Sequence, residues 1–148
     1  MITKILVPID GSRISRKAAV YAVDFAKQTG ASVFLLSVID KRFVVSQSIP
    51  SADSPTHIAD PVEDYLRQAA EAYTTEIEGL CKKNKVPSKT LIKSGHPVEK
   101  IVKEAEKLKA DLIIMGSRGN SALKAAIIGS ITLGVLNKTA KIPVLVIR

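Results

Sequence analysis

Residues 2–39 read ITKILVPIDGSRISRKAAVYAVDFAKQTGASVFLLSVI, and this run predicts a strand, a helix and a second strand. The segment 2–9 is mostly apolar and the segment 32–39 is almost continuously so, as expected of buried strands. Between them apolar residues recur at helical spacing over 14–25, and Gly30 follows as the glycine that commonly ends a helix. Two apolar strands joined by a helix are typical of a parallel sheet that is covered on both faces.

The rest of the chain continues this alternation. The sequence Asp-Pro-Val-Glu at 60–63 combines an N-cap residue, a proline at the first helical position and an acid at the third, and so predicts a helix start. The further elements predicted are a helix 60–80, a strand 86–92, a helix 97–108, a strand 111–115, a helix 131–139 and a strand 143–147. We therefore predict one α/β domain over residues 1–148, with a doubly wound, five-stranded parallel sheet and helices on both faces.

The segment 41–59 interrupts the pattern. It has four Ser and two Pro, includes Asp53, Gln47 and His57, and shows little periodicity. A connection of this length without structure of its own is uncommon inside a compact domain, and it is too short to link to a second domain. We expect it to be a mobile flap, which would lie just after Val38 at one edge of the sheet.

The charge of the chain allows more than one interpretation. The formal net charge is +8, from 22 basic and 14 acidic residues, and such a charge attracts polyanions. The lysines are spread over the predicted helices, however, and aromatic residues make up only 4% of the chain, with none of the interleaving that stacks bases. A solvated surface is therefore the favoured interpretation. A nucleic-acid-associated protein stays as an alternative, and no membrane partner is predicted.

The cellular location is expected from what the sequence lacks. The N-terminal apolar run is interrupted by Lys4 and closed by Pro8, so it does not read as a signal peptide. No apolar run approaches the roughly 20 residues needed to span a bilayer. Cys81 is the single cysteine, falls on the apolar stripe of its helix and cannot form an internal disulfide. The prediction is a cytoplasmic protein in which Cys81 is a core residue.

Two segments are predicted to meet at the ligand edge of the sheet. In open α/β sheets ligands bind beyond the carboxyl ends of the strands, where strand order reverses. The segment 8–12 follows the first strand and the segment 115–119 follows the fourth. We therefore expect Asp10 to contact a ligand. Asp111 lies at the opposite end of its strand, and we expect it to have a structural role.

Glycines give the second of these segments a possible phosphate site. Without a Cβ, glycine lets the backbone approach a ligand and reach positive φ, so that its N–H groups can point at phosphate oxygens. Gly129 and Ser130 are expected to place free N–H groups and a hydroxyl at a helix N-terminus, which favours anions. The alternative is that Gly116, Gly119 and Gly129 only shape turns and Ser130 only caps its helix. The residues alone leave both interpretations open.

The spacing of these residues resembles a known family. Gly116, two residues, Gly119, nine residues and Gly129-Ser130 resemble the ATP-binding signature of the universal stress protein family. The resemblance covers essentially the whole chain and is carried also by KILVPIDGS at 4–12, ADLIIMGSRG at 110–119 and IPVLV at 142–146. It implies a Rossmann-like sheet of the adenine nucleotide alpha hydrolase type, with strand order 3-2-1-4-5.

The resemblance also implies a site and an assembly. It places Pro8 and Asp10 at the adenosine, Val38 at the adenine and Gly116 by the ribose. The residues that it assigns to the phosphates are Gly119, Gly129, Ser130 and Ile131. A magnesium or manganese ion would then be held through the phosphates of ATP. The final strand, 143–147, is expected to pair with its own copy in a homodimer, which would also protect an apolar edge.

Competing chemistries find less support. Gly129 to Gly134 has the glycine spacing of a Walker A loop, but Val135 and Leu136 stand where Lys and Ser/Thr are required. No G-x-G-x-x-G motif follows the first strand, and His57 and His96 lack the neighbours of a metal site. We predict no catalytic residue and no protein-held metal. The expected function is a nucleotide-dependent binding or signalling module of the stress response. The alternative from the enzyme class is a slow ATPase or a nucleotidyl- or phosphoryl-transfer enzyme.

Overall fold

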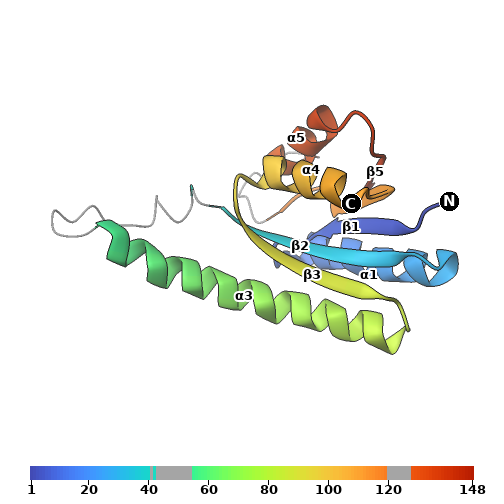
Figure 1. The fold of residues 1–148 in the computed structure, drawn as a ribbon, viewed down its shortest axis with the longest axis horizontal. Helices are drawn as coiled ribbons and strands as arrows, with labels where there is room; N and C mark the ends of the chain where they lie inside the picture. Colours follow the sequence, from blue (N-terminus) through green and yellow to red (C-terminus); the bar gives the residue numbers. More distant parts are fainter. Residues whose placement is uncertain (41, 43–54, 120–127) are drawn as a thin grey trace.

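Five parallel strands form one sheet in the order β3-β2-β1-β4-β5 (Figure 1). The computed structural model describes residues 1–40, 42, 55–119 and 128–148, without the side chains of 55–60. The elements are β1 (Lys4–Pro8), α1 (Arg13–Thr29), β2 (Ser32–Asp40), α3 (Pro55–Lys83), β3 (Ser88–Gly95), α4 (Pro97–Leu108), β4 (Leu112–Gly116), α5 (Ser130–Lys138) and β5 (Val144–Ile147). The predicted fold class and strand order are confirmed.

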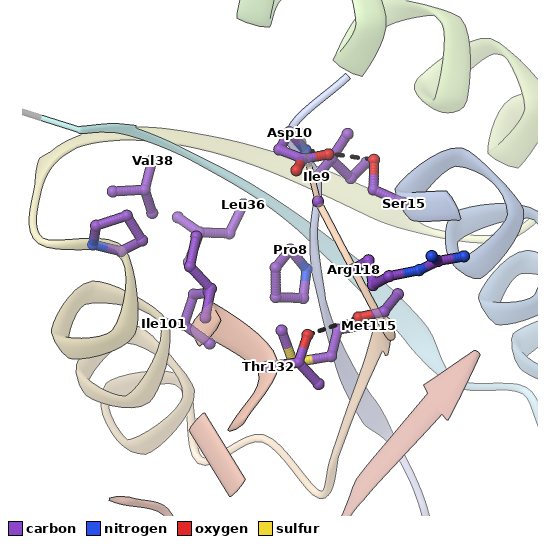
Figure 2. A pocket seen from close by; sticks show the side chains of 14 residues that line it. Pro8, Ile9, Asp10, Ser15, Leu36, Val38, Ile101, Met115, Arg118 and Thr132 are labelled. Atoms are coloured by element: carbon purple, nitrogen blue, oxygen red, sulfur yellow. Dashed lines mark hydrogen bonds between the residues drawn. The ribbon is translucent and has the colours of Figure 1, made fainter. Parts of the chain in front are cut away.

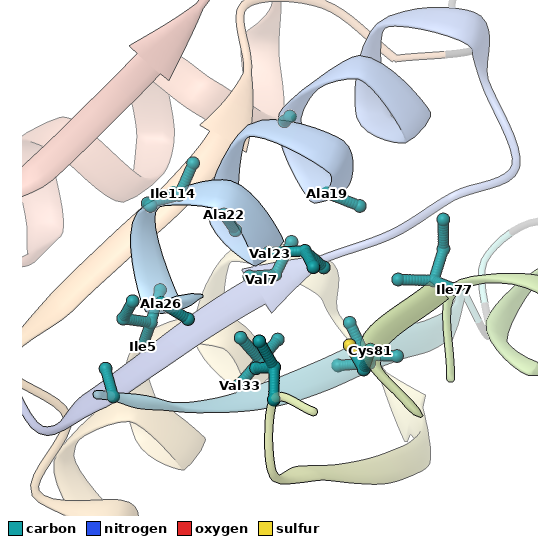
Figure 3. Packing of buried hydrophobic residues seen from close by; sticks show 14 of the residues in the cluster. Ile5, Val7, Ala19, Ala22, Val23, Ala26, Val33, Ile77, Cys81 and Ile114 are labelled. Carbon is teal, nitrogen blue, oxygen red and sulfur yellow. The ribbon is translucent and has the colours of Figure 1, made fainter. Parts of the chain in front are cut away.

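The sheet is covered on both faces because its central strands carry apolar side chains in both directions. Ile5 and Val7 of β1 point to the face covered by α1 and α3, where Val23, Ile77 and their neighbours are buried (Figure 3). Leu6 points to the opposite face, which is covered by α4 and α5. This two-sided burial explains why the strand segments are apolar without alternation.

Strand β1 is the point from which the order of the sheet reverses. It pairs with β2 on one side, in register from Lys4 with Ser32 to Pro8 with Leu36, and with β4 on the other. From β1 the chain adds β2 and then β3 on one side. It then crosses to the other side of β1, where it adds β4 and then β5. The carboxyl ends of β1 and β4 lie side by side, which is the crevice where such sheets bind ligands.

Capping residues define both ends of α1 and the start of α4. Ser12 is the N-cap of α1, and its hydroxyl accepts a 3.1 Å hydrogen bond from the N–H of Ser15. Gly30 ends that helix at φ +78°, a conformation that favours glycine. His96 occupies the N-cap position of α4 and Pro97 its first position. His96 is thus a helix-start residue, in agreement with the helix predicted over 97–108.

The predicted start of helix α3 is wrong. Helix α3 begins at Pro55, and Pro61 lies inside it. Pro55 already takes the first position, where a missing N–H costs nothing, so the local signal at 60–63 does not start the helix. Residues 55–59 therefore belong to a helix and not to the expected flap, of which 41 and 43–54 lie outside the described residues. No helix in the described ranges is long and apolar enough to cross a bilayer.

Candidate functional site

A hollow opens at the carboxyl edge of the sheet, where β1, β2 and β4 end and where α4 and α5 begin (Figure 2). It measures about 530 Å³, counting the part that is open to solvent. The lining residues are Pro8, Ile9, Asp10, Ser15, Leu36, Val38, Pro97, Ile101, Met115, Gly116, Arg118, Gly119, Ile131 and Thr132.

One part of the hollow is an apolar slot. Leu36 and Val38 stand two residues apart on β2 and so project from the same face of the sheet. Pro8 and Ile101 face them from β1 and α4 (Figure 2). Walls of this kind fit a flat apolar group, such as the ring system of a nucleobase.

The polar residues of the rim are held by the fold itself. The carboxylate of Asp10 accepts a 2.9 Å hydrogen bond from the N–H of Ser12, which fixes the turn between β1 and α1. The hydroxyl of Thr132 is buried and donates a 2.8 Å bond to the carbonyl of Gly116. The hydroxyl proton of Thr132 is thus used inside the fold.

Gly116 and Gly119 are needed for close approach and not for positive φ. A Cβ on Gly116 would lie 2.7 Å from the side chain of Ile14, at the start of α1. A Cβ on Gly119 would collide with the carboxylate of Asp10. Neither residue has a positive φ, nor does Gly129. The expectation that these glycines supply left-handed backbone is therefore wrong: at 116 and 119 glycine lets two segments of the site pack together.

Gly129 and Ser130 lie beside the hollow and not in its lining. Gly129 is the buried N-cap of α5 at φ −74°, and its N–H donates a 2.7 Å bond to the carbonyl of Ser117. The expectation of a free N–H at Gly129 is therefore wrong. The first bond within α5 runs from Leu133 to Gly129. The N–H groups of Ser130, Ile131 and Thr132 thus have no partner in the helix, as in every first turn, and they remain suited to an anion.

Tyr73 connects α3 to the turn that carries Asp10. Its hydroxyl lies 2.8 Å from the hydroxyl of Ser37 on β2. Its ring covers Gly11, where φ is +80° and a Cβ would lie 2.9 Å from the ring. Burial raises the pKa of the Tyr73 phenol, the bond to Ser37 lowers it in part, and the charge of Asp10 raises it further. Tyr73 is therefore a neutral residue whose ring packs against the turn at Gly11.

The comparisons with known proteins agree with this architecture. A model of the universal stress protein family matches residues 1–148. The chain belongs to this family. Universal stress protein MJ0577 of Methanocaldococcus jannaschii is 33% identical over 156 residues, which cover 100% of this chain and 96% of the relative. Universal stress protein YxiE of Bacillus subtilis is 30% identical over 149 residues, with 100% of both chains covered.

Solved structures of universal stress proteins superpose on the whole chain. The structure of MJ0577 has a TM-score of 0.86 and covers 99% of this chain and 96% of its own. A universal stress protein solved in complex with cAMP has a TM-score of 0.72 at 23% identity, covering 99% and 97%. At that identity the likeness shows the fold alone.

The structure of this universal stress protein brings most of the predicted site residues together. Those that line the hollow are Pro8, Asp10, Val38, Gly116, Gly119 and Ile131. Sequence reasoning missed Leu36, Pro97 and Ile101. Signals for them were present: Leu36 stands two residues before Val38, and Pro97 and Ile101 lie one turn apart at the start of a helix that begins at the ligand edge.

No group of three His, Cys, Asp or Glu side chains that could hold a metal ion gathers in the described part of this universal stress protein.

Cys81 is buried in the same core cluster as the apolar residues of α1, and burial raises the pKa of its thiol. Its role is packing, as predicted. The side chain of His57 lies outside the described residues.

Proposed function

We propose that this universal stress protein binds ATP in the hollow and acts as a nucleotide-dependent binding module in the stress response. One observation carries the proposal. The lining of one hollow combines the apolar slot, Asp10 and Gly119 with Ile131 and Thr132 of the first turn of α5, so that surfaces suited to a base and to phosphates adjoin the same space. A nucleoside triphosphate carries both kinds of group.

The residues fit the parts of the nucleotide as follows. Val38 and Leu36 would contact adenine, and Pro8 would contact the adenosine. The carboxylate of Asp10 would accept hydrogen bonds from ribose hydroxyls, because an anionic group at this point suits hydroxyls and repels phosphate. The phosphates would then lie toward Gly119 and the first turn of α5.

A divalent ion fits this arrangement only as a companion of the nucleotide. Magnesium keeps several water ligands and binds readily to phosphate oxygens, and the rim supplies hydroxyls and one carboxylate. We propose that magnesium or manganese enters with ATP. The further parts of the proposal are a cytoplasmic location and a signalling partner whose identity the sequence does not give.

The test is to identify the nucleotide released when the purified protein is denatured, followed by calorimetric titration with ATP, ADP, AMP, cAMP and GTP. We expect ATP to bind most tightly, because only its phosphates extend along the first turn of α5. The cAMP-bound relative makes cAMP the sharpest competitor. Equal affinity for cAMP and ATP would contradict the phosphate part of the proposal, and the absence of adenine nucleotide binding would overturn it.

A slow ATPase is the second candidate, favoured by one observation: Arg118 lines the hollow. An arginine near the γ-phosphate stabilises the transition state when a positioned water accompanies it. The described rim offers hydroxyls and Asp10 at the ribose, and His96 lies at the N-cap of α4 outside the lining. We expect turnover slower than about one per minute. Single-turnover measurement at several per second, lost in Gly129→Val, would make the protein an enzyme.

We also propose a homodimer through β5. This strand is the edge of the sheet beyond β4, and its four residues are apolar and only partly buried. An open apolar edge invites pairing, and a second copy related by a two-fold axis would supply it.

A further inference from the structure

Lysines gather at the end of the molecule opposite the hollow. We define the basic pole as residues 1–4, 27–31, 82–89 and 106–111. It contains eight lysines, all of them exposed: Lys4, Lys27, Lys82, Lys83, Lys85, Lys89, Lys107 and Lys109. Its carboxylates are only Glu106 and Asp111, and it holds no arginine or aromatic residue.

The topology brings these segments together. In a parallel sheet the strands begin where the covering helices end, and here α1, α3 and α4 end beside the beginnings of β1, β2 and β3 (right side of Figure 1). Two contacts join the segments directly. The amine of Lys4 donates a 3.2 Å bond to the carbonyl of Leu108, and that of Lys27 lies 3.4 Å from the side-chain oxygen of Asn84. The lysines that appear dispersed along the sequence are therefore concentrated in space.

The helix dipole explains some of these lysines but not all. Basic residues in a last helical turn are stabilising, which accounts for Lys27, Lys82, Lys83 and Lys107. Lys85 and Lys109 instead follow the ends of α3 and α4. The helix dipole does not explain why lysine occupies these two positions, where the backbone conformation is unusual for a residue with a side chain.

Lys85 and Lys109 occupy positions that favour glycine. Their φ values are +57° and +53°, and they are the only non-glycine residues with positive φ in the described part of the chain. Each is the left-handed residue of a Schellman motif. The N–H groups of Lys85 and Val86 bond to Lys82 and Cys81, and the end of α4 repeats the pattern. Helix α1 ends with Gly30 in the same conformation. Lysine at these two sites costs stability that glycine would recover, so fold stability does not explain it.

We propose that the basic pole binds the phosphate backbone of double-stranded nucleic acid without reading its sequence. Lysine amines are point charges that suit phosphates. The pole lacks the aromatic residues on which single strands stack. Met1 is its only exposed large apolar side chain, whereas membrane-surface binding calls for a broader apolar component. The pole lies at the amino ends of the strands, and the hollow lies at their carboxyl ends. The proposal of duplex binding and the proposal of ATP binding can therefore be tested independently of each other.

The experiment measures the affinity of the full chain for a short fluorescent DNA duplex by anisotropy over a salt series. With four to six phosphates neutralised, log K falls against log salt with a slope of about −4 to −5, so affinity drops roughly a hundredfold or more between about 50 and 200 mM. Lys82→Gln/Lys83→Gln/Lys85→Gln should lower affinity about tenfold or more and flatten the slope. A matched control, Arg13→Gln/Lys17→Gln/Lys138→Gln, removes the same charge elsewhere and should stay within about threefold of the parent.

A second variant separates binding from folding. Lys85→Gly/Lys109→Gly should raise the melting temperature, because it relieves two left-handed lysines, and should still weaken duplex binding. ATP affinity should be unchanged in every pole variant. Equal losses in the pole and control triples would overturn the inference, because net charge alone would then explain binding. Pole-dependent binding to phosphatidylserine vesicles without binding to the duplex would overturn it as well.

Discussion

At the scale of single residues, Gly119 is the glycine of the hollow with the least room for a side chain. Gly119→Ala would place a methyl group against the carboxylate of Asp10, so that either the carboxylate or the loop has to move. We expect ATP affinity to fall by roughly 1–3 kcal/mol, the usual cost of a lost hydrogen bond to a charged or buried group. Isothermal titration checks this.

The matched control is Gly79→Ala. Gly79 lies in α3 with nothing within 4 Å of its added Cβ. Alanine there should stabilise the helix by about 0.5–1 kcal/mol and leave ATP affinity unchanged. If Gly119→Ala binds ATP as tightly as Gly79→Ala does, Asp10 and Gly119 do not form the ribose end of the site.

Tyr73 supports the site through two separate contacts. Tyr73→Phe removes the hydroxyl that bonds to Ser37 but keeps the ring beneath Gly11. Because Ser37 is buried, the protein should lose about 1–2 kcal/mol of unfolding free energy in urea while ATP affinity changes little. Tyr73→Ala removes the ring as well and should lower ATP affinity. Equal losses of affinity in both variants would mean that the ring does not position the turn.

At the scale of elements, the first turn of α5 is joined directly to residues 117–119, which follow β4. The N–H of Gly129 bonds to Ser117, and a Cβ on Gly129 would lie 3.3 Å from the Cα of Arg118. Gly129→Val adds further methyl groups to this contact and should abolish detectable ATP binding by displacing residues 117–119. Ser130→Ala, one residue on, removes only an exposed hydroxyl and should cost about 1–2 kcal/mol of binding. Titration of both variants gives the comparison, and ATP binding to Gly129→Val at the parent's affinity would show that the site is misplaced.

The starts of β1 and β4 are joined by one carboxylate. Asp111 accepts bonds of 2.9 to 3.0 Å from the N–H groups of Thr3 and Lys4 and from the hydroxyl of Thr3. The N–H of Thr3, then that of Lys4, lowers the pKa of Asp111 below its ordinary value of 3.8. Asp111 is thus structural, as the sequence predicts.

The lowered pKa of Asp111 predicts the direction in which the stability of the protein changes with pH. A carboxyl whose pKa is lower in the folded state stabilises the protein above its unfolded pKa and loses that effect as pH falls through the folded pKa. Asp111→Asn keeps an acceptor but not the charge. Compared with the parent, Asp111→Asn should have a lower unfolding free energy, by an amount that is constant near neutral pH. The difference should vanish below the pKa that Asp111 has in the folded protein. Urea titrations over pH measure this, and a deficit that persists in acid would assign the effect to packing.

At the scale of the whole molecule, we expect the outer edge of β5 to control assembly. The carbonyls of Pro143 and Ile147 accept bonds of 3.0 and 2.7 Å from the β4 side, so by strand alternation Val144 and Val146 direct their backbone groups outward. Val146→Pro therefore removes an outward N–H without touching the bonds to β4, and edge strands tolerate proline there. We expect sedimentation to give a dimer for the parent and a monomer for Val146→Pro, with both folded. A parent that is monomeric at micromolar concentration with and without ATP would contradict the dimer.

The sequence by itself determined the order of strands and helices, the five-stranded parallel fold and the segments that form the ligand edge. These follow from periodicity, caps and glycine spacing, which are local properties of the chain. Only the tertiary structure decided that Gly119 faces Asp10, that Tyr73 supports Gly11 and that the N–H of Gly129 is already bonded. It also decided that dispersed lysines form one pole. Such contacts join residues far apart in sequence, and their distances depend on how helices pack on the sheet, which no local pattern records.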